Sequence, residues 1–374
     1  MVKVAFIGGG INSAVGQTHK IACQMDGRFQ VVAGAFSRNQ EINKQTGEVF
    51  QIPLNKVYDH YEELLIQEQG EVDAIIVLVP TDRHSEVVRK CILAGYPVIC
   101  EKSLATSTEQ GKELLQLVEE KEGFLCVTYN YTGYPMIRLL KEKIQQEELG
   151  NINHIEIEMP QEGFSRYTLT GEKPIPQKWR LLDYEIPTIS LDLGTHLHNM
   201  ITFLTNKQPV GVVARENTYG FFEGIIDDVN CMIDYSDKMT VQMWYSKVAL
   251  GHRNGLRVRV YGNKGSAEWY QLEPEILKIS NCLGETRILD RSNDWEIGNA
   301  PRYTRFKVGH PAGFIEAFAN YYQDIYEALK QYKVQGQWQS DYILPLECSV
   351  EGLQLFEQAH QSALERTWRE IVVS

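Results

Sequence analysis

Apolar residues in the first 130 positions occur as short continuous runs with helical patterns between them. The apolar runs are 2–7, 29–36, 72–79, 97–100 and 124–128. Helical spacing of apolar residues occupies 13–25, 41–50, 61–69, 84–94 and 108–121. Strands buried on both faces read as continuous apolar runs, and alternation of strands with helices builds a parallel sheet. The pattern predicts an α/β domain over residues 1–130.

The pattern changes after residue 130. A helix is predicted over 135–148, and residues 153–159 alternate between polar and apolar, as in a half-buried strand. Short strands follow at 210–216, 229–235, 239–246, 256–261, 266–271 and 275–280. These strands are too closely spaced for crossover helices, so we expect a large, mostly antiparallel sheet in an α+β domain spanning residues 131–374.

Three helical segments, 189–205, 312–331 and 346–365, are available to cover one face of this second sheet. The other face can be buried against a second copy of the chain. We therefore expect a homodimer or a homotetramer, with residues 131–374 serving both substrate binding and assembly.

The first apolar run ends in three glycines, Gly8 to Gly10, directly before the first predicted helix. Glycine lets the backbone turn sharply, and the N–H groups at a helix N-terminus bind a pyrophosphate. This predicts a Rossmann dinucleotide-binding domain in which Gly8, Gly10, Ile11 and Asn12 contact NAD(P). Ser13 stands where the third glycine of that motif usually lies, and a plain strand–helix turn is the alternative.

The end of the second strand carries Ser37 and Arg38 where an NAD-binding domain usually has an acidic residue. Without that residue nothing repels a 2′-phosphate, which the hydroxyl and the guanidinium can bind. NADP is therefore favoured slightly over NAD. The alternative is an arginine that is merely exposed, or one that stacks on the adenine of either cofactor.

Composition narrows the function further. The chain has 374 residues and a net charge of −12, with no cluster of basic residues, which argues against nucleic acid or an anionic membrane as a partner. No signal peptide or membrane span is evident. Seven scattered cysteines without a C-x-x-C motif are typical of buried thiols in a reducing compartment. These features predict a cytoplasmic protein of about two domains.

Ligands of open α/β sheets bind beyond the carboxyl ends of the strands. Lys102, in the tripeptide Glu101-Lys102-Ser103, follows the fourth predicted strand and is therefore placed for chemistry. Residues that follow the third, fourth and fifth predicted strands are the candidate cofactor contacts of this kind: Pro80, Thr81, His84, Glu101, Lys102 and Asn130.

Asp192 and His196 lie four residues apart at the start of a predicted helix, so they share one face. A carboxylate beside an imidazole orients it and raises its basicity, as a general base requires. The alternative is a helix-capping aspartate beside a structural histidine. His198 is expected to pack within the helix. The sequence has no further cluster of His, Cys and Asp residues with the spacing of metal ligands, so no metal site is predicted.

The chain resembles the Gfo/Idh/MocA oxidoreductases in four features: the glycine turn, the Glu101-Lys102 strand end, the loop Tyr129-Asn130-Tyr131, and the Asp-x-Gly-x-His pattern from Asp192. This is the glucose-fructose oxidoreductase and inositol dehydrogenase group. Ser103 replaces a family proline that is often preceded by a cis peptide bond. Because a cis bond costs a non-proline residue about 3 kcal/mol, we expect a trans bond here.

The resemblance implies an NAD(P)-dependent dehydrogenase acting on a sugar or cyclitol. It places Lys102, Asp192 and His196 at the substrate and Tyr131 at the sugar hydroxyls, with Trp179 and Arg180 beside the nicotinamide. Larger residues replace the family's glycine-rich run at 183–190 and should reshape the pocket. The alternatives are a catalytically silent NADP-binding sensor or scaffold, and an aldose–aldose oxidoreductase with non-dissociating NADP.

Overall fold

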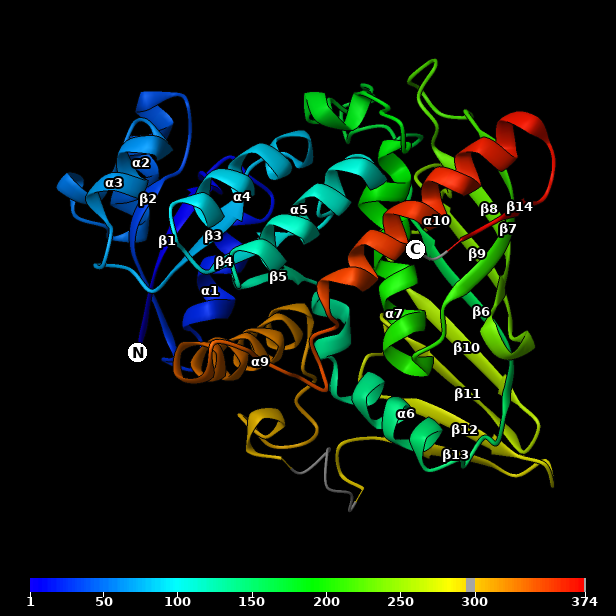
Figure 1. Ribbon diagram of the computed structural model, residues 1–374. Helices are drawn as coiled ribbons and strands as arrows, with labels where there is room; N and C mark the ends of the chain where they lie inside the picture. The colour runs from blue at the N-terminus through cyan, green and yellow to red at the C-terminus, as the bar shows by residue number, and fades with distance from the viewer. Residues whose placement is uncertain (294–299, 373–374) are drawn as a thin grey trace. The chain divides into compact units, whose positions relative to one another are not determined.

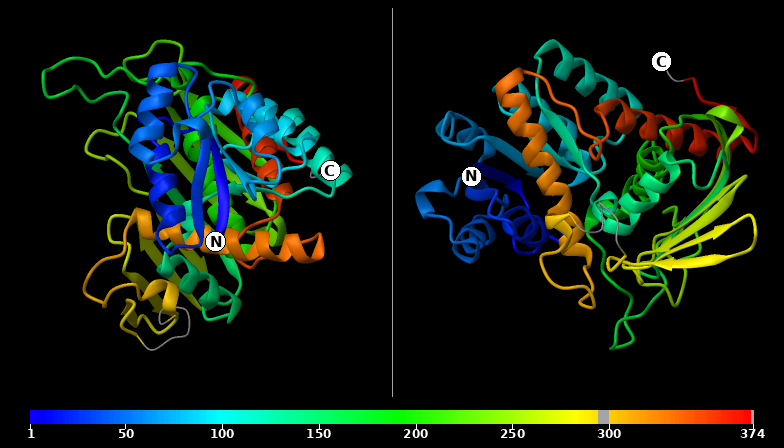
Figure 2. Two further views of the ribbon diagram at one scale, coloured as in Figure 1. Left: turned by 90° about the vertical axis from the view of Figure 1, so that its left-hand side faces the viewer. Right: turned by 90° about the horizontal axis from the view of Figure 1, so that it is seen from below.

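The computed structural model describes residues 1–293 and 300–372 and divides into two units (Figures 1 and 2). The first comprises Met1–Ala105, Glu109–Gly133 and Phe314–Val350. The second comprises Thr106–Thr108, Tyr134–Gly313 and Glu351–Ser374. The boundary expected at residue 130 lies close to Gly133, but the sequence pattern did not foresee that the chain returns to the first unit at residue 314.

The first unit is built on a five-stranded parallel sheet in the order β2-β1-β3-β4-β5, as expected for a Rossmann domain. Its strands are β1 (Val2–Gly8), β2 (Phe29–Ala35), β3 (Ala74–Leu78), β4 (Val98–Glu101) and β5 (Leu125–Thr128). Its helices are α1 (Gly16–Gln24), α2 (Gln40–Phe50), α3 (Tyr61–Gln67), α4 (His84–Leu93), α5 (Thr108–Glu120) and α9 (Phe314–Gln335). Every residue of β3, β4 and β5 is buried, which explains their continuous apolar sequence.

Helix α1 begins three residues later than predicted, at Gly16 rather than Ser13. A Cβ atom on Gly16 would lie 1.9 Å from the carbonyl oxygen of Gly9, so only glycine permits this approach of helix to turn. Gly16 therefore serves the close packing of helix on strand for which the third glycine of the motif is known, and the turn before it is longer than the motif predicts.

Helix α9 packs in the first unit and not, as predicted, on the second sheet. His19 of α1 contacts Phe318 of α9 edge-on with 4.7 Å between ring centroids, and Phe29 of β2 contacts Tyr322 at 5.6 Å. Apolar spacing shows that a helix has a face to bury but does not identify the surface that buries it.

The second unit holds a nine-stranded sheet in the order β13-β12-β11-β10-β6-β9-β8-β7-β14. Its pairs are antiparallel except for β6 with β9. The strands are β6 (Ile152–Pro160), β7 (Pro209–Asn217), β8 (Asp228–Tyr235), β9 (Thr240–Ser246), β10 (Arg257–Gly262), β11 (Gly265–Tyr270), β12 (Leu277–Asn281), β13 (Thr286–Leu289) and β14 (Arg369–Glu370). The two short edge strands, β13 and β14, were not predicted.

Helices α6 (Pro135–Gln145), α7 (Thr195–Thr205) and α10 (Leu346–Glu365) lie over one face of this sheet (Figures 1 and 2). Side chains of β8 alternate accordingly: Cys231, Ile233 and Tyr235 are buried, whereas Met232 is 65% exposed on the outer face. Assembly of a homodimer or homotetramer through this outer face stays a prediction.

The cysteines are free, and five are buried as expected. Cys282 is exposed and Cys348 is partly exposed, because the first follows β12 in the turn to the edge strand β13 and the second lies in the first turn of α10. Within residues 1–293 and 300–372, no helix is both long and apolar enough to cross a membrane.

Candidate active site

The glycine turn after β1 has the geometry that a bound dinucleotide requires. Gly8 has φ +87°, and a Cβ atom there would lie 2.6 Å from the carbonyl group of Leu78. A Cβ atom on Gly10 would lie 3.2 Å from the carbonyl oxygen of Phe36. Helix α1 receives no side-chain cap at its N-terminus. Its first N–H groups therefore suit an anion, and the turn fits the pyrophosphate of NAD(P).

Ile11 and Asn12 are exposed within this turn, and the Ile11 N–H donates to Thr46 Oγ1 at 3.1 Å. At the end of β2, Ser37 Oγ accepts the N–H of Asn39 at 3.2 Å. Arg38 is exposed and has no ion-pair partner among the described residues. This guanidinium is available to a ligand.

Glu101, next to Lys102, belongs to a buried polar network. Its Oε1 accepts the Thr128 hydroxyl at 2.9 Å and lies 3.2 Å from His19 Nε2. The other ring nitrogen of His19, Nδ1, lies 2.6 Å from the hydroxyl of Tyr322. These contacts hold the end of β4, and with it the backbone from which Lys102 projects. No sequence pattern points to His19, because a lone histidine in a helix carries no recognisable signal.

The peptide bond between Lys102 and Ser103 is cis, so the expectation of a trans bond was wrong. The expectation rested on the local preference of serine, whereas Ser103 is 1% exposed and its backbone is held by a neighbour. His84 Nδ1 lies 2.6 Å from the Ser103 carbonyl oxygen, and His84 Nε2 lies 2.8 Å from that of Val79. Burial lowers the pKa of His84, and a neutral imidazole donates to one of the two carbonyls at a time.

Other candidates in the first unit are Pro80, which is exposed, and Thr81, Asn130 and Tyr131, which are buried. Asn130 is 3% exposed, and its Nδ2 has no hydrogen-bond partner among the described residues. A buried amide donor of this kind costs free energy unless a ligand accepts its hydrogen bond. This observation also fits a bound cofactor.

Asp192, in the second unit, lies in a π-helical turn, Ser190–Gly194, directly before α7. The N–H of Thr195 donates to the Ser190 carbonyl oxygen, as the wider turn requires, and such turns often occur at functional sites. Asp192 is 8% exposed, and its Oδ2 accepts from the Arg180 guanidinium and from the ammonium group of Lys247, the latter at 2.6 Å. Arg180 also lies over the ring of Trp179, with 4.3 Å from Cζ to the centroid.

His196 follows Asp192 by one turn, in the first turn of α7, and is 8% exposed. The structure thus brings Asp192 together with Arg180 and with Lys247. Lys247 was not among the residues predicted from the sequence. Lys247 comes directly after β9, so the available signal was a lysine at the end of a predicted strand.

His198 packs within the second unit, as expected. It is 2% exposed, and its Nε2 lies 3.4 Å from Oε1 of Glu351 on α10. Burial raises the pKa of Glu351 from 4.5 to about 7. A carboxyl whose pKa is higher in the folded state stabilises the fold below the unfolded pKa, and this contribution is lost as the pH rises to about 7.

We therefore expect Glu351→Gln to raise Tm relative to wild type at pH 8 but not at pH 5. The pKa shift of Glu351 corresponds to at most about 3 kcal/mol, so the gain in Tm at pH 8 should be roughly 2–6 °C. Thermal unfolding at both pH values measures it. Glu347→Gln, at an exposed position of the same helix, is the matched control and should follow the wild-type pH dependence.

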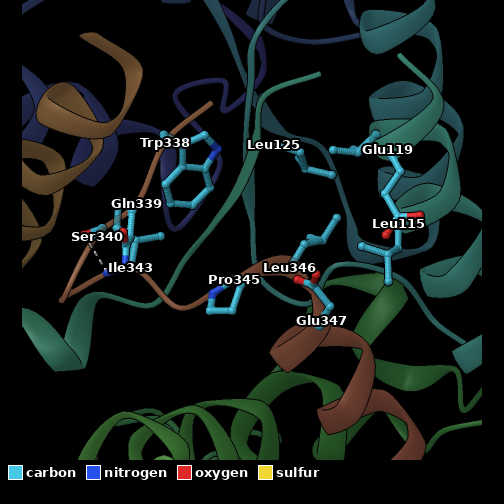
Figure 3. Close-up of a pocket in the computed structure, with 11 residues that line it drawn as sticks. Leu115, Glu119, Leu125, Trp338, Gln339, Ser340, Ile343, Pro345, Leu346 and Glu347 are labelled. Atoms are coloured by element: carbon cyan, nitrogen blue, oxygen red, sulfur yellow. Dashed lines mark hydrogen bonds between the residues drawn. The ribbon is translucent and has the colours of Figure 1, made fainter. Parts of the chain in front are cut away.

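A separate pocket of 380 Å³ lies in the first unit (Figure 3). Helix α5 and strand β5 line it on one side, and the segment around Trp338, Ile343 and Leu346 lines it on the other. None of the candidate site residues contributes to its lining. Across the described part of the chain, no group of three potential ligands is placed to hold a metal ion.

The parallel sheet and the glycine turn after β1 are those of a dinucleotide-binding Rossmann domain. The model of the oxidoreductase family with an NAD-binding Rossmann fold (GFO_IDH_MocA) matches residues 2–129, and that of the GFO/IDH/MocA C-terminal domain matches residues 137–268. The chain belongs to the Gfo/Idh/MocA family, as its sequence motifs indicated.

Relatives within the family extend over most of the chain. The uncharacterized oxidoreductase YfiI of Bacillus subtilis is 28% identical, over 97% of this chain and 94% of its own. The scyllo-inositol 2-dehydrogenase (NADP(+)) IolW of the same organism is 23% identical, over 73% of this chain and 70% of its own. An inositol dehydrogenase homolog from Azotobacter vinelandii, solved with NADH and myo-inositol, has the same fold, with a TM-score of 0.88 at 24% identity, covering 99% of this chain and 97% of that one.

Proposed function

We propose that the protein is an NAD(P)-dependent dehydrogenase that oxidises a carbinol carbon of a sugar or cyclitol and reduces the corresponding ketone in reverse. The observation that carries this proposal is the buried Asp192 carboxylate, held by two cations one helical turn before His196. The relatives of the chain include inositol dehydrogenases, which supports a polyol as substrate.

In this proposal each side chain of the site has a defined role. NAD(P), when bound, supplies the carbon that accepts or returns the hydride. His196 takes the proton of the reacting hydroxyl, and Asp192 orients the imidazole and accepts from a substrate hydroxyl. Lys102 donates to the reacting oxygen and stabilises the negative charge that develops on it. Tyr131 contacts substrate hydroxyls, and Trp179 and Arg180 lie at the nicotinamide.

The test is a panel of inositols, free sugars and keto-sugars, each assayed with NAD and with NADP by absorbance at 340 nm. We expect turnover of at least one polyol, with loss of turnover in His196→Ala. Binding of NADPH without turnover of any panel member would instead favour the catalytically silent sensor or scaffold.

Cofactor choice depends on Arg38. We propose that NADP is preferred, since residues 37–39 include no acidic side chain and Arg38 has no ion-pair partner in the described part of the chain. Arg38→Ala removes a charge-assisted hydrogen bond to the 2′-phosphate, worth roughly 1.5–3 kcal/mol, so its NADP affinity should fall about 10- to 150-fold. NAD affinity should change little.

Fluorescence titration with NADPH and NADH measures both affinities, with Arg28→Ala as the matched control at a partly exposed arginine near the start of β2. Equal weakening of NADPH and NADH in Arg38→Ala would show that the guanidinium only stacks on the adenine, and the preference for NADP would then be abandoned.

A further inference from the structure

Lys247 is a buried lysine whose backbone N–H and carbonyl groups both form hydrogen bonds with other segments of the backbone. It is 4% exposed, its N–H donates to the Asp227 carbonyl oxygen at 2.8 Å, and its own carbonyl oxygen accepts from Phe164 N–H at 2.8 Å. Its ammonium group lies over the ring of Phe164, 5.0 Å from the centroid. The loop after β9 thus fixes where the ammonium group lies.

Asp192 provides the carboxylate that this ammonium group requires. A buried ammonium is costly unless it is paired and hydrogen-bonded, and Lys247 Nζ lies 2.6 Å from Asp192 Oδ2. The nitrogen–oxygen distance is that of a strong charge-assisted hydrogen bond. The pairing joins the end of a strand to the π-helical turn before α7, so it ties the carboxylate to the sheet.

The contact also gives the two carboxylate oxygens of Asp192 different hydrogen-bond partners. Arg180 and Lys247 both donate to Oδ2, and an oxygen atom has two lone pairs. Hydrogen bonds from an imidazole or a substrate hydroxyl are then directed to Oδ1. Two cationic donors on Oδ2 favour the ionised form of the carboxyl, which makes Asp192 an acceptor and a poor base.

We propose that Lys247 is a positioning residue that holds the Asp192 carboxylate ionised and in one orientation, so that His196 takes the substrate proton. This role rests on the proposed function. The role extends that function by adding a residue from the loop after β9 whose effect on catalysis passes through Asp192.

The test is a double-mutant cycle with Lys247→Met, Asp192→Asn and the double variant, in the full-length protein. The probe is myo-inositol, or the panel polyol with the highest turnover if myo-inositol is not a substrate. Lys247→Met should lower kcat roughly 10- to 100-fold, the loss of one charge-assisted hydrogen bond, with the KM for the cofactor unchanged. In the Asp192→Asn background the same substitution should lower kcat less than about threefold, because its target is gone.

Tm supplies a readout that is independent of turnover. Lys247→Met leaves Asp192 with one cation fewer, so Tm should fall, and the further substitution Asp192→Asn should restore part of the loss. Lys278→Met, at an exposed position of β12 in the same unit, is the matched control and should leave both kcat and Tm unchanged.

The outcomes separate the two proposals. If Asp192→Asn leaves kcat unchanged, the Asp192 carboxylate is not needed for turnover. The proposed function is then contradicted, and the positioning role of Lys247 with it. If Asp192→Asn lowers kcat but Lys247→Met does not, or if Lys247→Met lowers kcat equally in both backgrounds, the proposed function stands and the positioning role of Lys247 is overturned.

Discussion

Replacement of His196 by alanine should lower kcat by about 10²–10⁴-fold while the protein remains folded and binds NAD(P) as before. The imidazole is the general base of the proposed reaction, and alanine removes the group that accepts the substrate proton. Steady-state kinetics at 340 nm measure the effect on kcat, and fluorescence titration with NADPH measures cofactor binding on the same preparations.

His198→Asn is the matched control for this substitution. His198 lies two residues further along α7 and packs against Glu351 in the interior of the second unit. Its replacement should lower Tm but leave the kcat of the folded protein close to wild type. The reverse pattern, in which His196→Ala loses stability and keeps its turnover, would show that His196 is a structural histidine and would remove the base from the mechanism.

Replacement of Lys102 by alanine should lower kcat by a factor similar to that of His196→Ala, roughly 10²–10³-fold. The ammonium group is proposed to donate to the reacting oxygen, where negative charge develops as the reaction proceeds. Because that interaction strengthens in the transition state, kcat should fall much more than the affinity for substrate or cofactor.

Lys121→Ala, at an exposed position after α5, is the control for loss of a lysine in the same unit and should behave as wild type. Unchanged kcat in Lys102→Ala would contradict the proposed mechanism. Reduced NADPH affinity with unchanged kcat would reassign Lys102 to cofactor binding.

The candidate site could be predicted from sequence only in part. Lys102 and Asn130 are predicted because they follow buried strands, and Asp192 with His196 because a spacing of four is a local property of helices. Lys247 and His19 are separated from their partners Asp192 and Glu101 by 55 and 82 positions. No local pattern connects residues so far apart along the chain, and only the folded chain shows that they touch.

What the sequence by itself determined is the set of elements and the class of fold. Continuous apolar runs specified the buried parallel strands, period-two alternation specified the half-buried strands of the second sheet, and the glycines marked the turn after β1. These signals are local, because the side-chain period and backbone freedom act within a few residues.

Tertiary structure alone decided how those elements are used. It packed α9 in the first unit through His19 and Phe318, and it placed a cis bond before Ser103. It also made Gly16, rather than the residue at position 13, the glycine that allows close packing of helix α1 on the turn. It also paired Asp192 with Lys247. Each of these outcomes depends on which surfaces meet, and packing between distant segments outweighs the local preferences from which sequence patterns are read.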